Sequence, residues 1–118
     1  MKAFIFAGLS ILILILIVVV NGIYVSSVSK ELEELSTELS FDDKNGLEEL
    51  ESYWRKNETI VCLSISHNDI DNLNIAIDVL KSKQKNGEDS GFYEYKAMLL
   101  NYIEEIRNKE RVHIHNIL

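Results

Sequence analysis

The fold of this protein is decided by residues 3–20, AFIFAGLSILILILIVVV. The run carries no charge and no proline, and its Leu, Ile, Phe and Val side chains all favour the centre of a bilayer. At 1.5 Å per residue, about 18 to 20 such residues form a helix roughly 30 Å long, which matches the hydrocarbon thickness of a membrane. We therefore predict that residues 1–24 are a transmembrane anchor that contacts the lipid bilayer from Phe4 to Val20.

A cleaved signal peptide is the alternative interpretation, because Lys2 before an apolar run also matches the start of a secretory signal. The run is longer than an ordinary signal peptide, and the small residues at Gly22 and Ser27 make only mediocre cleavage sites. The sequence therefore favours an uncleaved signal anchor. Lys2 precedes the run, whereas Lys30 is followed at once by acidic residues, which favours a cytoplasmic amino terminus and an extracytoplasmic remainder.

The composition after the anchor fits one small acidic domain. Without Lys2, eleven basic and nineteen acidic residues remain, a formal net charge of −8. Such a surface repels nucleic acid and anionic lipid headgroups, so we expect neither as a ligand and expect the polar side to stand clear of the membrane. Cys62 is the single cysteine, which excludes an internal disulfide and is typical of a buried thiol.

Residues 25–40 predict a juxtamembrane amphipathic helix, because apolar side chains recur there at three- and four-residue spacing. These side chains are Val25, Val28, Leu32, Leu35 and Leu39. The helix can leave the membrane as a stalk or join a bundle, and the sequence leaves both possibilities open. Residues 40–46 supply Ser, Asp, Asn and Gly together, which predicts a turn.

Apolar residues then continue at helical spacing from Leu47 onward, and the pattern itself does not stop. An unbroken helix over residues 43–85 would be about 60 Å long, which a domain of this size cannot cover. A break is therefore needed. We place it at Ser66–Asp69, with Asn68 as the helix cap and acidic residues in the first turn. The alternative is a break at residues 57–59.

Two further apolar stripes predict two more helices. They consist of Ile70, Leu73, Ile77 and Leu80, and of Phe92, Tyr95, Leu99, Tyr102 and Ile106. Basic residues followed by Asn86 and Gly87 separate them as a stop signal. No strand pattern occurs, so we predict an all-α protein: an N-terminal transmembrane helix and a small three- to four-helix bundle. Residues 41–118 form the predicted extracytoplasmic helical domain, whose last ten residues dock either as helix or as extended chain.

A set of motif residues carries a resemblance to a known family. They are Trp54, His67, Asp69, Ile70, Asp71, Asn116, Ile117 and Leu118. Over essentially its whole length the chain resembles the bacterial domain-of-unknown-function 4363 family, with two departures: Glu is usual where Asp69 stands, and a second aromatic often lies near Val61. The resemblance implies a small membrane-anchored helical protein of the bacterial envelope, and it brings no activity, cofactor or catalytic residue.

Two groups of side chains are candidates for a site. His67 and Asp71 share a helix face, and with Asp69 they could orient a base or bind a metal. The helix start already explains both carboxylates, so we favour a structural role. His113 and His115 point to the same side only in an extended chain, where they could join His67 as weak metal candidates. We expect no metal and no cofactor.

The sequence contains no glycine-rich phosphate loop, no nucleophile elbow and no paired cysteines, so we expect no enzyme. The favoured hypothesis is a non-enzymatic protein-interaction module of the cell envelope, with a membrane or envelope protein as its partner. The alternatives are a ligand or metal sensor that uses the three histidines, and a helical protein secreted after signal cleavage.

Overall fold

Four helices joined by short loops make up the chain. The computed structural model describes the backbone of residues 1–117 and the side chains of residues 1–110. The helices are α1 (Lys2–Thr37), α2 (Lys44–Val61), α3 (His67–Lys85) and α4 (Asp89–Ile117). No strand occurs in residues 1–117. The predicted all-α class, with a long apolar N-terminal helix ahead of a bundle, is confirmed.

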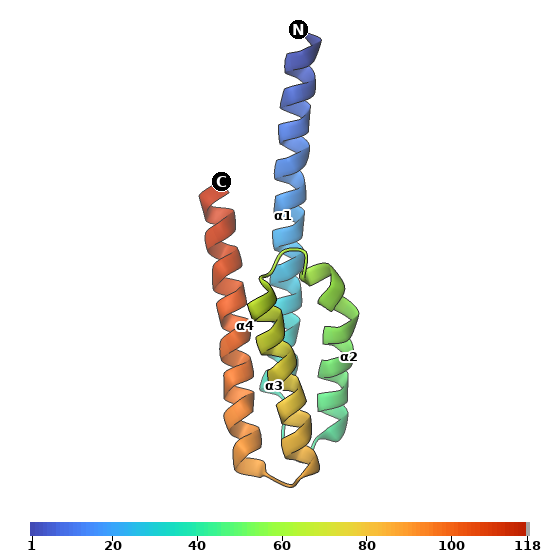
Figure 1. Ribbon diagram of the computed structural model, residues 1–118, viewed down its shortest axis with the longest axis vertical. Coiled ribbons are helices and arrows are strands. Elements are labelled where there is room, and N and C mark those ends of the chain that lie inside the picture. The colour runs from blue at the N-terminus through green and yellow to red at the C-terminus, as the bar shows by residue number, and fades with distance from the viewer. Residues whose placement is uncertain (118) are drawn as a thin grey trace.

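The helices run alternately up and down, so that neighbours in sequence are antiparallel (Figure 1). α1 packs against α2 and α4, and α3 packs against the same two helices. α1 emerges from the bundle at one end, which also holds the α2–α3 loop and the last turns of α4 (Figure 1). We call this end the anchor end. The opposite, distal end holds the α1–α2 loop and the α3–α4 turn.

α1 is one unbroken helix that lies in two different environments. Its side chains are exposed from the amino terminus to Ile17, whereas Val25, Val28 and Leu32 are buried in the bundle core. The 36 residues of α1 extend for about 54 Å. Of the helix predicted over residues 25–40, residues 25–37 belong to α1. They form no separate stalk, because they are part of the first helix of the bundle, which continues directly from the apolar segment.

The bundle core consists of the apolar stripes that the sequence analysis identified. Trp54, Phe92 and Leu50 are its largest fully buried side chains. They lie with Leu47 and Val61 of α2, Leu73, Ile77 and Leu80 of α3, and Leu99, Ile103 and Ile106 of α4. Each helix thus buries one face, which is the condition for a stable bundle. Cys62 is only half-buried, so the prediction of a buried thiol was wrong.

The break between α2 and α3 lies at residues 62–66, close to the predicted position. The alternative break at residues 57–59 was wrong, because these residues belong to α2. The predicted cap, Asn68, was also wrong: Ser66 is the N-cap of α3 and its hydroxyl accepts the amide of Asp69 at 3.3 Å. Ser66 has an extended backbone (φ −64°, ψ 150°), the conformation a capping residue needs, whereas Asn68 lies inside the helix.

The predicted stop signal at the end of α3 is confirmed. Gly87 has a φ of +72°, in the left-handed region that favours glycine. The amide of Glu88 donates to the carbonyl of Lys83 at 2.9 Å, which completes a Schellman-type cap. The chain thereby reverses within a few residues and returns as α4.

The end of the chain, which could have been helix or extended, is helical through Ile117. α4 runs antiparallel to α1 and extends past the α2–α3 loop (Figure 1). Both termini therefore point away from the same end of the bundle. The family-motif residue Leu118 lies outside the described residues.

Candidate functional site

A cleft of about 340 Å³ lies at the anchor end, where α1, the α2–α3 loop, α3 and α4 converge. Its walls include Val18 and Asn21 of α1, Leu63 and Ser64 of the loop, and Lys109 of α4. These residues come from distant parts of the sequence. The cleft is the place where the apolar segment of α1 meets the bundle.

Polar contacts hold the α2–α3 loop against α1 at this level. Asn21 is the first strongly polar residue after the apolar run, and its amide donates to the hydroxyl of Ser64. One turn further along α1, the hydroxyl of Tyr24 donates to the side-chain carbonyl of Asn57 at 2.5 Å. The loop is therefore fixed beside the residue at which α1 changes from apolar to mixed composition.

An ion pair between Asp69 and Lys109 closes the other side of the cleft. Asp69 is only 7% exposed, and both of its carboxylate oxygens accept from the Lys109 ammonium at 3.1 Å. The Lys109 side chain is 64% exposed, so water screens the pair and its net contribution is modest. The pair fastens the start of α3 to α4. It gives Asp69 a structural partner that sequence reasoning missed.

The three residues proposed as a histidine–carboxylate site are not brought together. His67 and Asp71 are exposed, and neither makes a hydrogen bond or ion pair with the side chains of residues 1–110. Asp69 is turned to α4 instead. One signal could have identified Lys109: it follows the core residue Ile106 by three positions, which places it beside the core-facing side of α4, within reach of a carboxylate on a neighbouring helix.

The backbone conformation contradicts the geometry that the metal-site hypothesis required. It required an extended chain at His113 and His115, but the backbone there is helical, and residues two apart in a helix diverge by about 200°. The side chains of both histidines lie outside the described residues. Among the described side chains, no group of three or more potential metal ligands is found.

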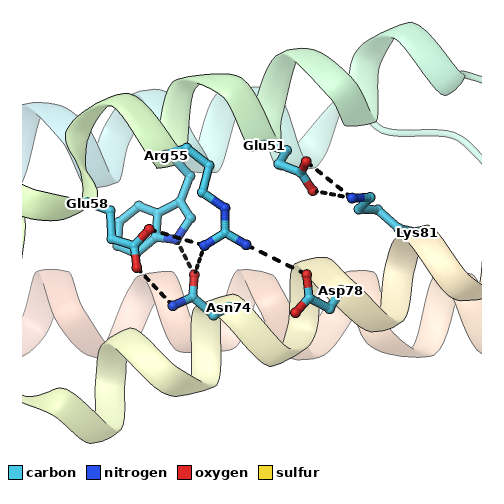
Figure 2. Close-up of polar contacts among 7 residues, drawn as sticks. Glu51, Arg55, Glu58, Asn74, Asp78 and Lys81 are labelled. Atoms are coloured by element: carbon cyan, nitrogen blue, oxygen red, sulfur yellow. Dashed lines mark hydrogen bonds and ion pairs between the residues drawn. The ribbon is translucent and has the colours of Figure 1, made fainter.

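A second polar cluster joins α2 to α3 and is centred on Asn74 (Figure 2). The indole N–H of Trp54 donates to the Asn74 carbonyl oxygen at 2.7 Å, and Arg55 donates to the same oxygen at 2.9 Å. The Asn74 amide in turn donates to Glu58 at 3.0 Å. Because Trp54 is fully buried, this contact satisfies a donor that would otherwise be buried without a partner.

The charges around this cluster compensate one another (Figure 2). Arg55 pairs with Glu58 at 3.1 Å and approaches Asp78 at 3.7 Å, and Lys81 pairs with Glu51 at 3.0 Å. All of these side chains bridge or flank the line between α2 and α3. The cluster therefore acts as a clamp between two helices, and Trp54 has a structural role within it.

A wider cleft of about 530 Å³ lies near the distal end between α2 and α3. Three lysines line it, Lys44, Lys81 and Lys85, together with Glu48 and Glu51. Lys81 is already paired with Glu51, so the remaining charges are of both signs. This composition is typical of an ordinary charged surface.

The family-motif residues separate into core, pair and surface positions. Trp54 and Ile70 belong to the core, and Asp69 forms the ion pair with α4. Asn116 and Ile117 lie on the last helical turn of α4, with side chains outside the described residues. Among the motif residues with described side chains, Trp54, Asp69 and Ile70 therefore have packing or pairing roles, and His67 and Asp71 lie on the surface.

One known family matches most of the chain. The family model described as Domain of unknown function (DUF4363) matches residues 18–117. The match begins at the last residues of the apolar run and includes all of the bundle. Searches of curated proteins and of solved structures found no match.

Proposed function

Since the chain belongs to the DUF4363 family, whose description names no activity, we propose its function from the geometry. The protein is a single-pass membrane protein of the bacterial envelope. Its bundle is an extracytoplasmic, non-enzymatic module that binds another membrane or envelope protein.

One observation supports the proposal above all others: α1 is continuous from an exposed apolar segment into the bundle core. This segment has a mean hydropathy of 3.2 over 18 residues, and none of those residues is buried within the protein. In water, so large an apolar surface would drive aggregation. A bilayer covers it, and the unbroken helix then holds the bundle directly at the membrane surface without a flexible linker.

The packing of α1 also argues for retention of the anchor. Cleavage after Ser27 would remove Val25, which is buried in the core, and Tyr24, which bonds to Asn57. Cleavage after Gly22 would remove the contact between Asn21 and the α2–α3 loop. A secreted form would therefore lack contacts that the folded bundle uses.

Acidic side chains on the outer faces of two helices are the proposed recognition surfaces. Glu34 of α1 and Glu38, the C-cap residue of α1, are both exposed, and Glu104 and Glu105 are exposed on α4. Their charge suits a partner with a basic surface, and it opposes nucleic acid. The polar clusters inside the bundle are already paired among themselves, which supports a binding role over a catalytic one.

Capture of the partner tests this proposal. The full-length protein is crosslinked in its own membranes, solubilised and purified, once with its own anchor and once with an unrelated transmembrane helix. We expect a reproducible partner that is retained after the anchor swap. No partner in either form would contradict the interaction proposal, and a partner lost with the swap would move recognition from the bundle into the bilayer.

Two matched charge variants locate the surface. Glu34→Gln with Glu38→Gln and Glu104→Gln with Glu105→Gln each remove two exposed carboxylates, but from different helices. We expect one pair to abolish capture while the other preserves it. If both variants capture the partner as well as the unmodified protein does, these acidic faces are excluded as the binding surface.

The orientation has a separate test at the distal end. Cys62 lies beside the anchor, so it is a poor reporter, whereas Asn45 is exposed in the first turn of α2. We expect Asn45→Cys, in a Cys62→Ser background, to react with a membrane-impermeant maleimide in intact cells. Labelling only after lysis would contradict the extracytoplasmic placement.

A further inference from the structure

We propose that the anchor end of the bundle is a second membrane-contacting surface. The α2–α3 loop, with its exposed Leu63, inserts apolar side chains into the interfacial layer of the bilayer that α1 spans. This inference rests on the membrane anchoring proposed above, but it concerns a different part of the chain. Its consequence is a bundle held in one orientation against the lipid surface.

The level of the loop along α1 is the first step of the argument. The bond from Asn21 to Ser64 places the loop beside the end of the apolar run, and Val18 lines the same cleft as Leu63. When the apolar run fills the hydrocarbon core, the loop lies at the boundary between hydrocarbon and headgroups. Contact between the loop and lipid then follows from rigid geometry.

The second step is the character of the exposed side chains at that level. Leu63 is 82% exposed and Ile60 is 51% exposed, and the amide of Leu63 donates to the carbonyl of Ile60 at 3.2 Å, so they form one turn. On α1, Ile23 is 63% exposed two residues after Asn21. Large apolar side chains this exposed lose contact with water when they enter the interfacial layer, at about 25 cal/mol for each Å² covered.

α4 gives the third step. Lys109 lines the cleft, and the α4 backbone continues as a helix for eight residues to Ile117, which carries it about 12 Å further along α1. Figure 1 shows this extension past the α2–α3 loop. With the loop at the boundary between hydrocarbon and headgroups, a helix that continues about 12 Å past the loop toward the amino terminus of α1 extends beyond that boundary, so the last turns of α4 also contact lipid.

The sequence of that extension suits a lipid surface. Residues 111–117 are RVHIHNI, a segment that combines one arginine and two histidines with three apolar residues and contains no carboxylate side chain, although the protein as a whole is acidic. Basic residues are attracted to anionic headgroups, and apolar residues favour the layer beneath them. The α2–α3 loop and the end of α4 therefore both suit contact with the interfacial layer of the bilayer.

Depth-dependent quenching tests the inference on the full-length protein in vesicles of phosphatidylethanolamine and phosphatidylglycerol. Each variant carries one cysteine in a Cys62→Ser background, labelled with an environment-sensitive fluorophore. Leu63→Cys probes the loop, Ile11→Cys reports insertion of the anchor, and Asn45→Cys is the exposed control at the distal end. Nitroxide labels are placed on the lipids either at the headgroup or deep in the acyl chain.

We expect shallow nitroxides to quench the probe at Leu63, deep nitroxides to quench the probe at Ile11, and neither to quench the probe at Asn45. Quenching at Ile11 without quenching at Leu63 would overturn the inference and leave the anchor intact. Failure at Ile11 would overturn both. The fluorescence of the probe at Leu63 could instead change with the number of protein molecules per vesicle and not with the nitroxide-labelled lipids. That result would assign the loop to contact with a second copy of the protein, which also overturns the inference.

A matched pair of surface variants provides an independent readout. Leu63→Asp and Ile75→Asp each place a charge at an exposed apolar position, one at the anchor end and one on α3. We expect faster amide exchange of residues 62–66 in vesicles for Leu63→Asp only. Equal exchange in the two variants would contradict a lipid-covered loop.

Discussion

The hydrogen bond between Trp54 and Asn74 allows a quantitative prediction about what fastens α2 to α3. The indole N–H donates at 2.7 Å to an oxygen that also accepts from Arg55, and Trp54 is fully buried. Asn74→Ala removes the acceptor and leaves this donor inside the protein. Trp54→Phe removes the donor instead, and the Asn74 oxygen keeps its bond from Arg55.

The two changes therefore differ in kind. A buried donor left without a partner costs about 1–3 kcal/mol. Asn74 itself is half-buried, so water can reach part of the vacated space, and we expect a loss of about 2 kcal/mol for Asn74→Ala. Trp54→Phe loses one hydrogen bond, about 1 kcal/mol, and some core volume. In the double variant no buried donor is left without an acceptor. Its loss of stability should therefore be smaller than the sum of the two single losses by about 1 kcal/mol.

Thermal unfolding in nanodiscs, followed by circular dichroism at the helical band, measures these differences while the anchor stays in lipid. For a domain of this size each 1 kcal/mol lowers Tm by roughly 4–8 °C. The control is Asp78→Ala, because Asp78 is exposed and lies 3.7 Å from Arg55, and its removal should cost at most about 0.5 kcal/mol. If Asn74→Ala is as stable as this control, or if the double variant is fully additive, the reasoning about the buried indole is wrong.

Three further predictions concern single positions. Gly87→Ala should destabilise the bundle by about 1 kcal/mol, because alanine is strained at positive φ, and an unchanged Tm would refute the cap. The Ser36 hydroxyl is buried and has no hydrogen-bond partner among the described residues, so Ser36→Ala should raise stability by about 0.5–1 kcal/mol in urea unfolding; a loss would contradict this. Burial first, and then the charge of Glu31 and the nearby Tyr24, raise the pKa of Tyr53 above 10.0. The native state thus favours neutral Tyr53, so the stability that Tyr53 contributes is present below about pH 10 and is lost as the pH rises through the native pKa. Tyr53→Phe should therefore flatten the fall in Tm at alkaline pH. An unchanged dependence of Tm on pH would exclude Tyr53 as the group responsible.

Local patterns in the sequence were sufficient for the elements of this fold. The charge-free run of residues 3–20 predicts a long apolar helix, and three- and four-residue spacing identifies the buried face of each bundle helix. Gly87 marks a turn that only glycine adopts easily. These features depend on residues within one or two turns of each other, so the chain needs no tertiary contact to display them.

The anchor end was decided by tertiary structure. Sequence reasoning chose Asn68 as the cap of α3, but the backbone conformation that packing imposes makes it Ser66. It explained Asp69 by the start of α3 alone, whereas the carboxylate also meets Lys109, forty positions away.

Composition and spacing thus determined that the protein is an apolar helix followed by amphipathic helices. Whether α1 ends with the apolar run or continues into the core, and which loop lies beside Asn21, depended on the register of α1 against its neighbours. That register is set when the buried faces of all four helices fit together, because the free energy of burial belongs to the assembled core and to no single helix.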